Sequence, residues 1–442
     1  MKTILSLLIF VVLAIWVGQI YFGKKKLRLV EVGKKEYYLL SPNMYFVIFT
    51  VCTAPIFLGS LSLLKYGLWF MTMLALLFVG KVRIKFEFMT VMYSIFFLWL
   101  CYTMTYTTVP RDGMMMLIKF SLPILFLWLG YSGLSNEKDL IIFLKVVNIA
   151  ACIYCGFMGG FAWIFIRPLY LFSIGIFSVY AAFADFLTAV FIVPILLYWI
   201  TKEKKYIFCA LWMVLSTVLQ SVRTGMGGML LVFCIALLLK NKAKAIPGLA
   251  VAGAMFLGVI LFVPEVNEKF FGDDAGKVSA NDIVQGGALS MDNIEMSGRE
   301  YMWERVLDNC YRGNETFGGG LGTSGRFVKN YGEATQGLVM MHNDYLQILC
   351  DAGIVGIVFI ALFYISVILK VTSEVALRRC SPLVKLTGIM ALSSMVGIGF
   401  SMYFDNVVSN SMQSMVMPYI YIGFFLKALD LEKRSSNEVA SY

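Results

Sequence analysis

The sequence has 442 residues, of which 60% are hydrophobic and 15% aromatic, and its mean hydropathy is +0.79. One soluble core cannot bury that share of apolar side chains, so the composition excludes an ordinary soluble domain and indicates a polytopic membrane protein. The net charge of +10 does not call for nucleic acid as a partner, because 22 of the 37 basic residues lie in short clusters between apolar segments.

Thirteen apolar runs are long enough to cross a hydrocarbon layer of ~30 Å. They lie near residues 3–22, 43–62, 65–80, 89–107, 114–131, 140–165, 178–200, 206–222, 226–240, 245–264, 352–370, 384–404 and 411–427. The first run follows Lys2 and ends before three lysines, without a small-residue cleavage site, so we expect an uncleaved signal anchor. The predicted fold is all-α with 12–13 transmembrane helices, and the lower number holds if the first run is not a full span.

Basic residues predict the orientation of these helices, because Lys and Arg concentrate on the cytoplasmic side of short loops. The clusters occupy residues 24–35, 81–85, 202–205, 240–244, 370–385 and the tail from 427. Counting the apolar runs between them places every cluster on the same side. The amino terminus is therefore expected outside and the carboxyl terminus inside.

The longest polar segment covers residues 265–340, and the helix count places it outside. We therefore predict four parts: an N-terminal bundle of about ten spans (1–264), a large periplasmic loop (265–340), C-terminal transmembrane helices (341–428) and a cytoplasmic tail (429–442). So long a loop usually has helices and a function of its own. The loop contains twelve acidic and seven basic residues, so cations are the minority and each arginine is expected to have a specific role.

Arg299 lies in the loop stretch "SGREYMWERVLDN", whose apolar residues have helical spacing. Ser297 as N-cap and Glu300 three residues later form a predicted capping box. Arg299 then falls in the first helical turn, where an anion would meet both its guanidinium and the helix N-terminus. The alternative is a surface arginine that pairs with Glu295 or Asp292.

The next loop stretch, "FGGGLGTSGRF", contains G-x-G-x-x-G at Gly320, Gly322 and Gly325. No strand precedes it and no βαβ unit surrounds it, so it is not read as a dinucleotide fingerprint. We expect a tight loop whose backbone amides approach a ligand or the membrane surface. Ordinary turn chemistry remains the alternative.

His342 is the only histidine in the chain and precedes an amphipathic helix that enters the bilayer. In that helix Gly353 and Gly356 would allow close packing or a bend. A neutral imidazole near pH 7 can accept a hydroxyl proton, which makes His342 a candidate catalytic residue. The alternative is a polar side chain at the membrane interface.

Three further ionisable residues lie at outer helix ends or within the outer leaflet: Arg167 in "FIRPLY", Asp185 in "YAAFADFLTAV" and Arg223 in "LQSVRTGMGGML". Such groups are costly at membrane depth and usually face a cavity or a partner. The alternatives are a short outer turn for Arg223 and pairing with a neighbouring arginine for Asp185. Lys119, in "LIKFSLP", is interpreted as a snorkelling lysine.

The motifs "SVRTG", "SGREYMW", "GGGLGTSGRF" and "HNDYLQILCDAGIVGIVF", in that order on a many-helix scaffold, resemble the O-antigen polymerase and ligase superfamily of bacterial surface glycan assembly. The resemblance covers residues 215–365 by motif and the rest by hydropathy alone. It implies a GT-C-like glycosyltransferase with no cofactor or metal. Such an enzyme would move a glycan from undecaprenyl pyrophosphate to an acceptor hydroxyl at the outer side of the cytoplasmic (inner) membrane.

Carried over by position, the resemblance implies that Arg223 and Arg299 hold the pyrophosphate and that His342 activates or orients the acceptor hydroxyl. Residues expected to line the cavity are Arg167, Asp185, Asn343 and Tyr345. One departure concerns Asp351, which stands where the family often has a glutamate, so a contact made there by a longer side chain is in doubt.

Three functions remain in competition. A polymerase would join two lipid-linked oligosaccharides into O-antigen, capsule or exopolysaccharide, with a chain-length regulator as a further partner; a ligase would use lipid A core or protein as the acceptor. We favour the polymerase, although the donor site would be shared. A transporter is disfavoured because no paired repeats are visible. A serine hydrolase or a metalloprotease lacks its motif, since neither G-x-S-x-G nor H-E-x-x-H occurs.

Overall fold

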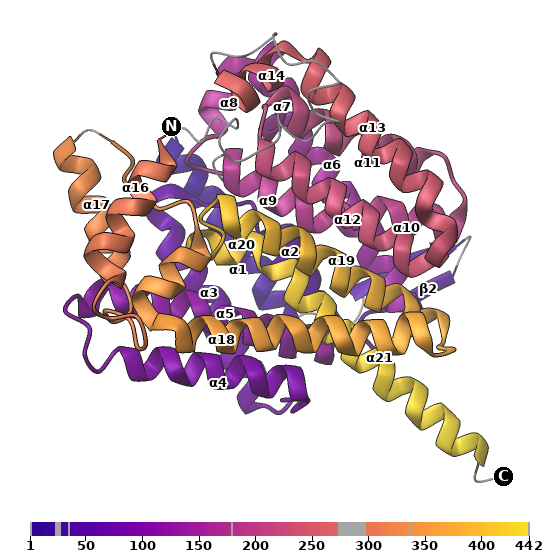
Figure 1. The fold of residues 1–442 in the computed structure, drawn as a ribbon. Helices are drawn as coiled ribbons and strands as arrows, with labels where there is room; N and C mark the ends of the chain where they lie inside the picture. Colours follow the sequence, from indigo (N-terminus) through magenta and orange to yellow (C-terminus); the bar gives the residue numbers. More distant parts are fainter. Residues whose placement is uncertain are drawn as a thin grey trace.

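The computed structural model describes residues 2–22, 28–33, 36–177, 180–272, 298–335 and 337–440. These residues are mainly helical, and they include one two-stranded antiparallel sheet (Figure 1). The first half comprises α1 (Lys2–Phe22), β1 (Leu29–Gly33), β2 (Glu36–Leu39), α2 (Pro42–Cys52), η2 (Gly59–Leu61), α3 (Ser62–Phe78), α4 (Phe88–Thr103), α5 (Pro110–Gly133), α6 (Glu137–Met158), α7 (Gly160–Phe165), α8 (Arg167–Ser173), α9 (Tyr180–Val190), α10 (Ile192–Thr201) and α11 (Lys205–Leu219). The second half comprises α12 (Arg223–Asn241), η3 (Lys242–Ala245), α13 (Ile246–Phe262), α14 (Pro264–Phe271), α16 (Arg299–Val306), η6 (Leu307–Tyr311), α17 (Thr323–Thr335), α18 (Asp344–Thr372), η7 (Ser373–Leu377), α19 (Pro382–Phe404), η8 (Val408–Asn410), α20 (Ser411–Ser414) and α21 (Val416–Ala440).

Within the described residues, eight helices are long and apolar enough to cross a membrane, or nine if the bent α20–α21 pair is one span. The prediction of an all-α polytopic membrane protein is confirmed at this level. The sequence did not predict the β1–β2 hairpin, in which Leu29 pairs with Leu39. It also predicted one span over 43–62, but α2 has 11 residues, about 16 Å, and the chain then turns at Leu58 and Gly59 with positive φ.

The long apolar segment Arg223–Phe262 is folded back on itself. α12 ends at Asn241, and η3 turns the chain into α13. As a result, Arg223 at the start of α12 donates a hydrogen bond to the carbonyl of Lys269 in α14, the helix that follows α13, at 2.6 Å. The segment is therefore two antiparallel helices, in agreement with the separate predicted runs 226–240 and 245–264.

Several basic clusters meet at one end of the helix bundle. Lys85 pairs with Asp430 of the C-terminal helix at 3.0 Å, and Arg378 lies 3.6 Å from Glu432 of the same helix. Lys385 donates to the carbonyl of Lys240 at 3.5 Å. Clusters that the helix count placed on one side are thus in contact. Figure 1 shows α16 and α17 on the opposite side of the molecule from the C-terminal end of α18.

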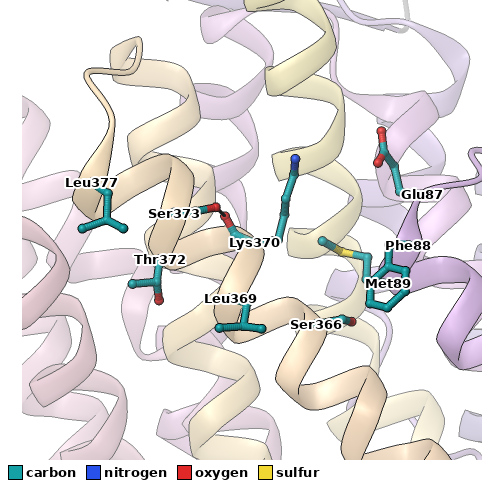
Figure 2. A pocket seen from close by; sticks show the side chains of 9 residues that line it. All are labelled: Glu87, Phe88, Met89, Ser366, Leu369, Lys370, Thr372, Ser373 and Leu377. Carbon is teal, nitrogen blue, oxygen red and sulfur yellow. Dashed lines mark hydrogen bonds between the residues drawn. The ribbon is translucent and has the colours of Figure 1, made fainter.

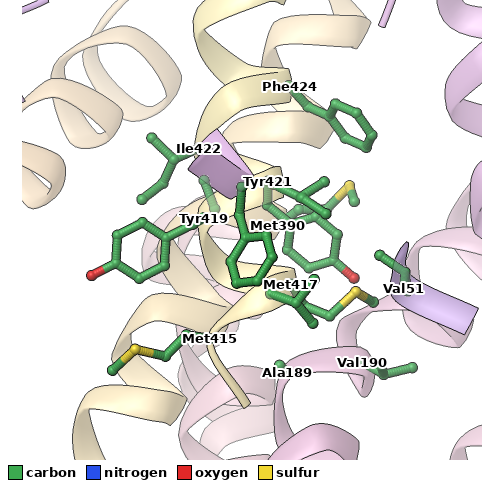
Figure 3. Packing of buried hydrophobic residues seen from close by; sticks show 14 of the residues in the cluster. Val51, Ala189, Val190, Met390, Met415, Met417, Tyr419, Tyr421, Ile422 and Phe424 are labelled. Atoms are coloured by element: carbon green, nitrogen blue, oxygen red, sulfur yellow. The ribbon is translucent and has the colours of Figure 1, made fainter. Parts of the chain in front are cut away.

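The core lies where α21 packs between its neighbours. Figure 3 shows Tyr421 and Phe424 of α21 with Met390 of α19, Val51 of α2 and Val190 of α9. All five side chains are fully buried. Because these side chains are fully buried, their close packing holds α21 in place.

α18 is broken at Gly353, where φ is +68° and ψ is −172°. The carbonyls just before the break have no partner within the helix, and they accept hydrogen bonds from Trp99 Nε1, Gly319 N and Gly320 N. Beyond the break, Ile354 N donates to the carbonyl of Glu315 at 2.9 Å. Unpaired backbone groups are costly where water cannot reach them, so these hydrogen bonds allow α18 to bend. The bend expected at Gly353 is present.

The break predicts a specific intolerance at Gly353. Its φ and ψ belong to a region that is essentially restricted to glycine, and a Cβ would lie 2.2 Å from the carbonyl oxygen of Thr316. We expect Gly353→Ala to cost about 1–3 kcal/mol of stability from backbone strain alone. The measurement is the thermal unfolding midpoint of purified protein in detergent.

Gly258→Ala in α13 is the matched control, because no atom lies within 4 Å of the added Cβ. A helix-interior glycine replaced by alanine is expected to be neutral or to stabilise by up to about 1 kcal/mol. Equal midpoints for the two variants would contradict the assigned strain.

Candidate active site

His342 immediately precedes the N-cap of α18 and has a left-handed backbone, with φ of +52°. This conformation is uncommon for a residue with a side chain and costs free energy. The backbone N–H of His342 donates to Oδ1 of Asn406 at 3.0 Å. The single imidazole of the chain is therefore held where α18 begins and α19 has just ended.

Two side chains hold the imidazole ring. Nδ1 lies 3.3 Å from Oδ1 of Asp405 and 3.0 Å from Nδ2 of Asn406. The orientation of the Asn406 amide is fixed, because its oxygen already accepts the N–H of His342 and its NH2 must face the ring. When Nδ1 carries the proton, it donates to Asp405, and Nε2 has a free lone pair. When Nδ1 carries no proton, it accepts a hydrogen bond from Asn406. The ring keeps one orientation in both tautomers.

The sequence analysis missed Asp405 and Asn406. Asp405 forms the C-cap of α19, and its Oδ1 also accepts the backbone N–H of Asn406 at 2.8 Å. Asp344 supports the same segment from α18, since its Oδ2 accepts Val408 N at 2.9 Å. The signal in the sequence was an adjacent acid and amide, "FDN", at the outer end of an apolar run. Nothing local linked this pair to a histidine 63 residues earlier.

Arg299 approaches the same segment from the large loop. α16 begins at Arg299 after Gly298, so Arg299 lies in the first turn as predicted. The predicted cap Ser297 and the alternative partners Asp292 and Glu295 lie outside the described residues. Arg299 Nη1 donates to the carbonyl of Phe404 at 2.7 Å, one residue before Asp405. The structure thus brings Arg299 and His342 to one short stretch of chain.

Arg223 lies at the start of α12, at the same end of the bundle. A Cβ on Gly227 would lie 2.6 Å from the ring of Phe400, which precedes Asp405 in α19 by about one turn. Beside Arg223 lies a second cation that the sequence analysis did not select. Burial, and then the positive charge of Arg223, lower the pKa of Lys269. Lys269 Nζ donates to the carbonyls of Gln220 at 3.4 Å and Ser221 at 3.3 Å, in the turn that leads to Arg223.

Asp185 is buried in the bundle, whereas Arg167 is exposed on its surface. Asp185 of α9 is fully buried and interacts electrostatically with Asp405, which contacts the imidazole. Arg167 is exposed on α8, where its guanidinium lies 4.6 Å from the centre of the Trp163 ring. Within the described residues, this contact of Arg167 does not join it to the imidazole.

Asn343 and Tyr345 support the scaffold beside the imidazole. Asn343 is the N-cap of α18, and its Oδ1 accepts Leu346 N at 2.9 Å. The hydroxyl of Tyr345 donates to the carbonyl of Gly399 in α19 at 2.9 Å. In this structure both residues fix the start of α18 relative to α19.

The glycine-rich loop binds the break in α18 through its amides. Gly322 N donates to one oxygen of Asp351 and Ser324 N to the other, each at 2.8 Å, and the carboxylate is fully buried. A Cβ on Gly320 would lie 2.6 Å from Thr107 Cα. We expected these amides to approach a ligand or the membrane surface, with turn chemistry as the alternative. Gly322 and Ser324 instead bind a side chain of α18, and the shorter acid at 351 makes this contact directly.

A cavity of about 200 Å³ borders the imidazole's partners, between α5, α17 and the segments on either side of His342. Met341 and Asn406 both line it. A larger cavity of about 480 Å³ lies elsewhere, between the start of α4 and the end of α18 (Figure 2). Its residue Ser366 is 22 positions after Asp344 in α18, about 30 Å along the helix. The larger cavity is therefore remote from His342.

The Asp351 contact predicts how firmly the glycine-rich loop is held. Asp351→Asn keeps the shape of the side chain but leaves one of two buried N–H groups facing another donor, at a cost of about 1–3 kcal/mol. Because about 1.4 kcal/mol is tenfold in an equilibrium, we expect trypsin to cleave after Lys329 in α17 roughly tenfold faster. Peptide mass spectrometry over a time course gives the rate.

Asp308→Asn is the control in the same loop, since it removes only an exposed ion pair with Arg312. The rate of cleavage after Lys329 should then match that of the wild type. A similar rate in Asp351→Asn would show that the carboxylate does not hold the loop.

Comparison with known proteins agrees with the resemblance inferred from the motifs. Residues 208–361 match the family model described as O-antigen ligase. No curated protein matches the chain. The matched region contains Arg223, Arg299 and His342, together with the break in α18. The likeness to the O-antigen polymerase and ligase superfamily is thus supported over this region, which comprises 154 of the 442 residues.

Proposed function

We propose that this protein transfers a glycan from a lipid pyrophosphate, undecaprenyl pyrophosphate in bacteria, to an acceptor hydroxyl on the outer side of the cytoplasmic membrane. The observation that carries the proposal is the imidazole of His342, which has a carboxylate and an amide at Nδ1 and an arginine at the adjoining chain segment. Members of this superfamily act in lipid-linked glycan assembly, which fits a helical bundle with polar groups at one end.

The proposed reaction uses these groups in two roles. The acceptor hydroxyl oxygen attacks the anomeric carbon, its proton passes to Nε2 of His342, and the carbon–oxygen bond to the pyrophosphate breaks. The pyrophosphate leaves with the bonding electron pair. Asp405 stabilises the imidazolium from the Nδ1 side, as an acid does in other histidine-based sites. Arg299, Arg223 and Lys269 stabilise the charge on the leaving group.

The outer orientation belongs to the same proposal. The contacts among Lys85, Lys385 and Arg378 with their neighbours gather basic residues at one end, and Lys and Arg favour the cytoplasmic side. The imidazole lies at the other end of α18 from these clusters. We therefore propose that the site faces outward, where lipid-linked glycans are polymerised or ligated.

Polymerase and ligase share this donor chemistry. We favour a polymerase that extends O-antigen, capsule or exopolysaccharide, with a second lipid-linked glycan as acceptor and a chain-length regulator as a further partner. The description of the matching family favours the second candidate, a ligase that attaches glycan to lipid A core. Purified protein given donor alone, and then donor with a core acceptor, separates the two: elongation with donor alone identifies a polymerase, and transfer only with core identifies a ligase.

His342 is predicted to act in proton transfer. Loss of a general base costs about 10²–10⁴-fold in rate, so we expect His342→Ala to lose that much transfer activity while donor binding stays intact. His342→Gln tests the role of the ring, because glutamine keeps a polar side chain but cannot take up a proton. Product analysis by mass spectrometry gives the rate, and full activity in His342→Gln would exclude proton transfer.

Arg299 is predicted to act through its charge. We expect Arg299→Lys to keep part of the transfer activity and Arg299→Ala little, with weaker donor binding in both. Arg312→Ala is the control, because Arg312 is an exposed arginine of the same loop that pairs with Asp308. Equal loss in Arg299→Lys and Arg299→Ala would instead indicate a bidentate fork or a packing role.

A further inference from the structure

The cavity beside His342 contains a lysine that the proposed chemistry does not use. Lys119 of α5 lines it, together with Asp112, Arg326, Lys329, Gln347 and Ser409. Arg326 is paired with Asp112 at 2.5 Å, and Lys329 lies 4.0 Å from Glu333. Within the described part of the chain, Lys119 makes neither an ion pair nor a hydrogen bond. The cavity therefore keeps one positive charge that its own acids do not neutralise.

Asp344 is the acid that acts electrostatically on Lys119, but the two side chains form no ion pair within the described residues. One carboxylate oxygen of Asp344 accepts the backbone N–H of Val408, and the other has no hydrogen-bond partner there. A half-buried ammonium needs hydrogen-bond acceptors, and an anion that enters the cavity would supply them. From the sequence, Lys119 was interpreted as a snorkelling lysine. Its position in the cavity indicates a second role, the binding of an anion.

The cavity and the cations assigned to the donor approach His342 from different elements. Arg299 comes from α16 and Arg223 from α12, whereas the cavity is formed by α5 and α17. At about 200 Å³ it is smaller than the usual pocket for a drug-sized ligand, so it suits one sugar residue rather than an oligosaccharide. Met115 and Met340 supply flexible apolar surface, against which the C–H face of a sugar can pack.

We propose that this cavity is the acceptor subsite and that Lys119 binds the carboxylate of an anionic sugar, a uronic acid, in the acceptor glycan. One unneutralised ammonium, flanked by the neutral polar groups of Gln347 and Ser409, matches one carboxylate on a hydroxyl-bearing ring. A phosphate would call for more donors. The inference rests on the proposed function, because only a glycosyl transferase needs an acceptor sugar next to the imidazole.

The test measures binding of simple sugars to the purified full chain in detergent by saturation-transfer NMR. Three pairs are compared: glucuronate with glucose, galacturonate with galactose, and mannuronate with mannose. We expect at least one uronate to bind about tenfold more tightly than its neutral partner, and Lys119→Met to abolish that preference. Lys119→Arg should keep it. Lys145→Met is the matched control, because Lys145 lies in α6 and outside the cavity.

A measurement on the wild type covers the case in which Lys119→Met fails to fold. An amine-acylating reagent labels the lysines, and mass spectrometry compares Lys119 with Lys145 in the presence of each sugar. Uronate should slow the labelling of Lys119 alone. The proposal is overturned if no uronate is preferred, if the preference survives in Lys119→Met, or if inorganic pyrophosphate protects Lys119 better than uronate does.

Binding of the lipid-linked donor separates this inference from the proposed function. Lys119→Met should bind donor as the wild type does, and Arg299→Ala should not. Donor binding without any uronate preference overturns the acceptor subsite alone. A wild type that binds uronate through Lys119 but no donor overturns the proposed function and leaves an anion site in the cavity.

Discussion

The break of α18 at Gly353 is the constraint on which the candidate site depends. A helix that breaks inside a packed bundle must satisfy the backbone groups that it leaves unpaired, because neither lipid nor apolar side chains offer hydrogen bonds. Here the large loop satisfies them, through the amides of Gly319 and Gly320 and the carbonyl of Glu315. Asp351 then binds Gly322 and Ser324 of the same loop. The loop is thereby fixed to the membrane bundle, and with it the elements that line the cavity.

The same logic extends to His342 at the start of α18. Its backbone lies in a region that a side chain disfavours, and its N–H, its ring and the next residue all make hydrogen bonds. Such a conformation persists only where the surroundings determine it, and observed strain of this kind concentrates at functional sites. The N-cap Asn343 fixes the helix, and Asn406 fixes the residue before it. The orientation of the imidazole follows from two helices together, α18 and α19.

The sequence revealed the features that are local in the chain. Apolar runs indicated a helical membrane protein, although the described residues have eight or nine helices long and apolar enough to cross a membrane and not the 12–13 expected. Helical spacing placed Arg299 in a first turn, and Gly353 indicated the bend. It did not reveal Asp405, Asn406 or Lys269, because each acts on a residue dozens of positions away and nothing in its own neighbourhood marks it. The span expected over 43–62 failed for a related reason: its apolar composition continues through Leu58, where the backbone turns. For the glycine-rich loop the tight turns were foreseen, but the partner of the amides was a side chain and not a ligand.

The distribution of charge around His342 fits the proposed reaction, which uses a single imidazole. On its Nδ1 side lies the carboxylate of Asp405, in contact with the ring. The cations Arg223, Arg299 and Lys269 come from other elements and suit the opposite need, a leaving group that gains negative charge. A single charged group could not favour both a protonated imidazole and a negatively charged leaving group. In the proposed reaction, separate helices therefore carry the two kinds of charge: the imidazole would take a proton from the acceptor while the arginines would stabilise the departing pyrophosphate.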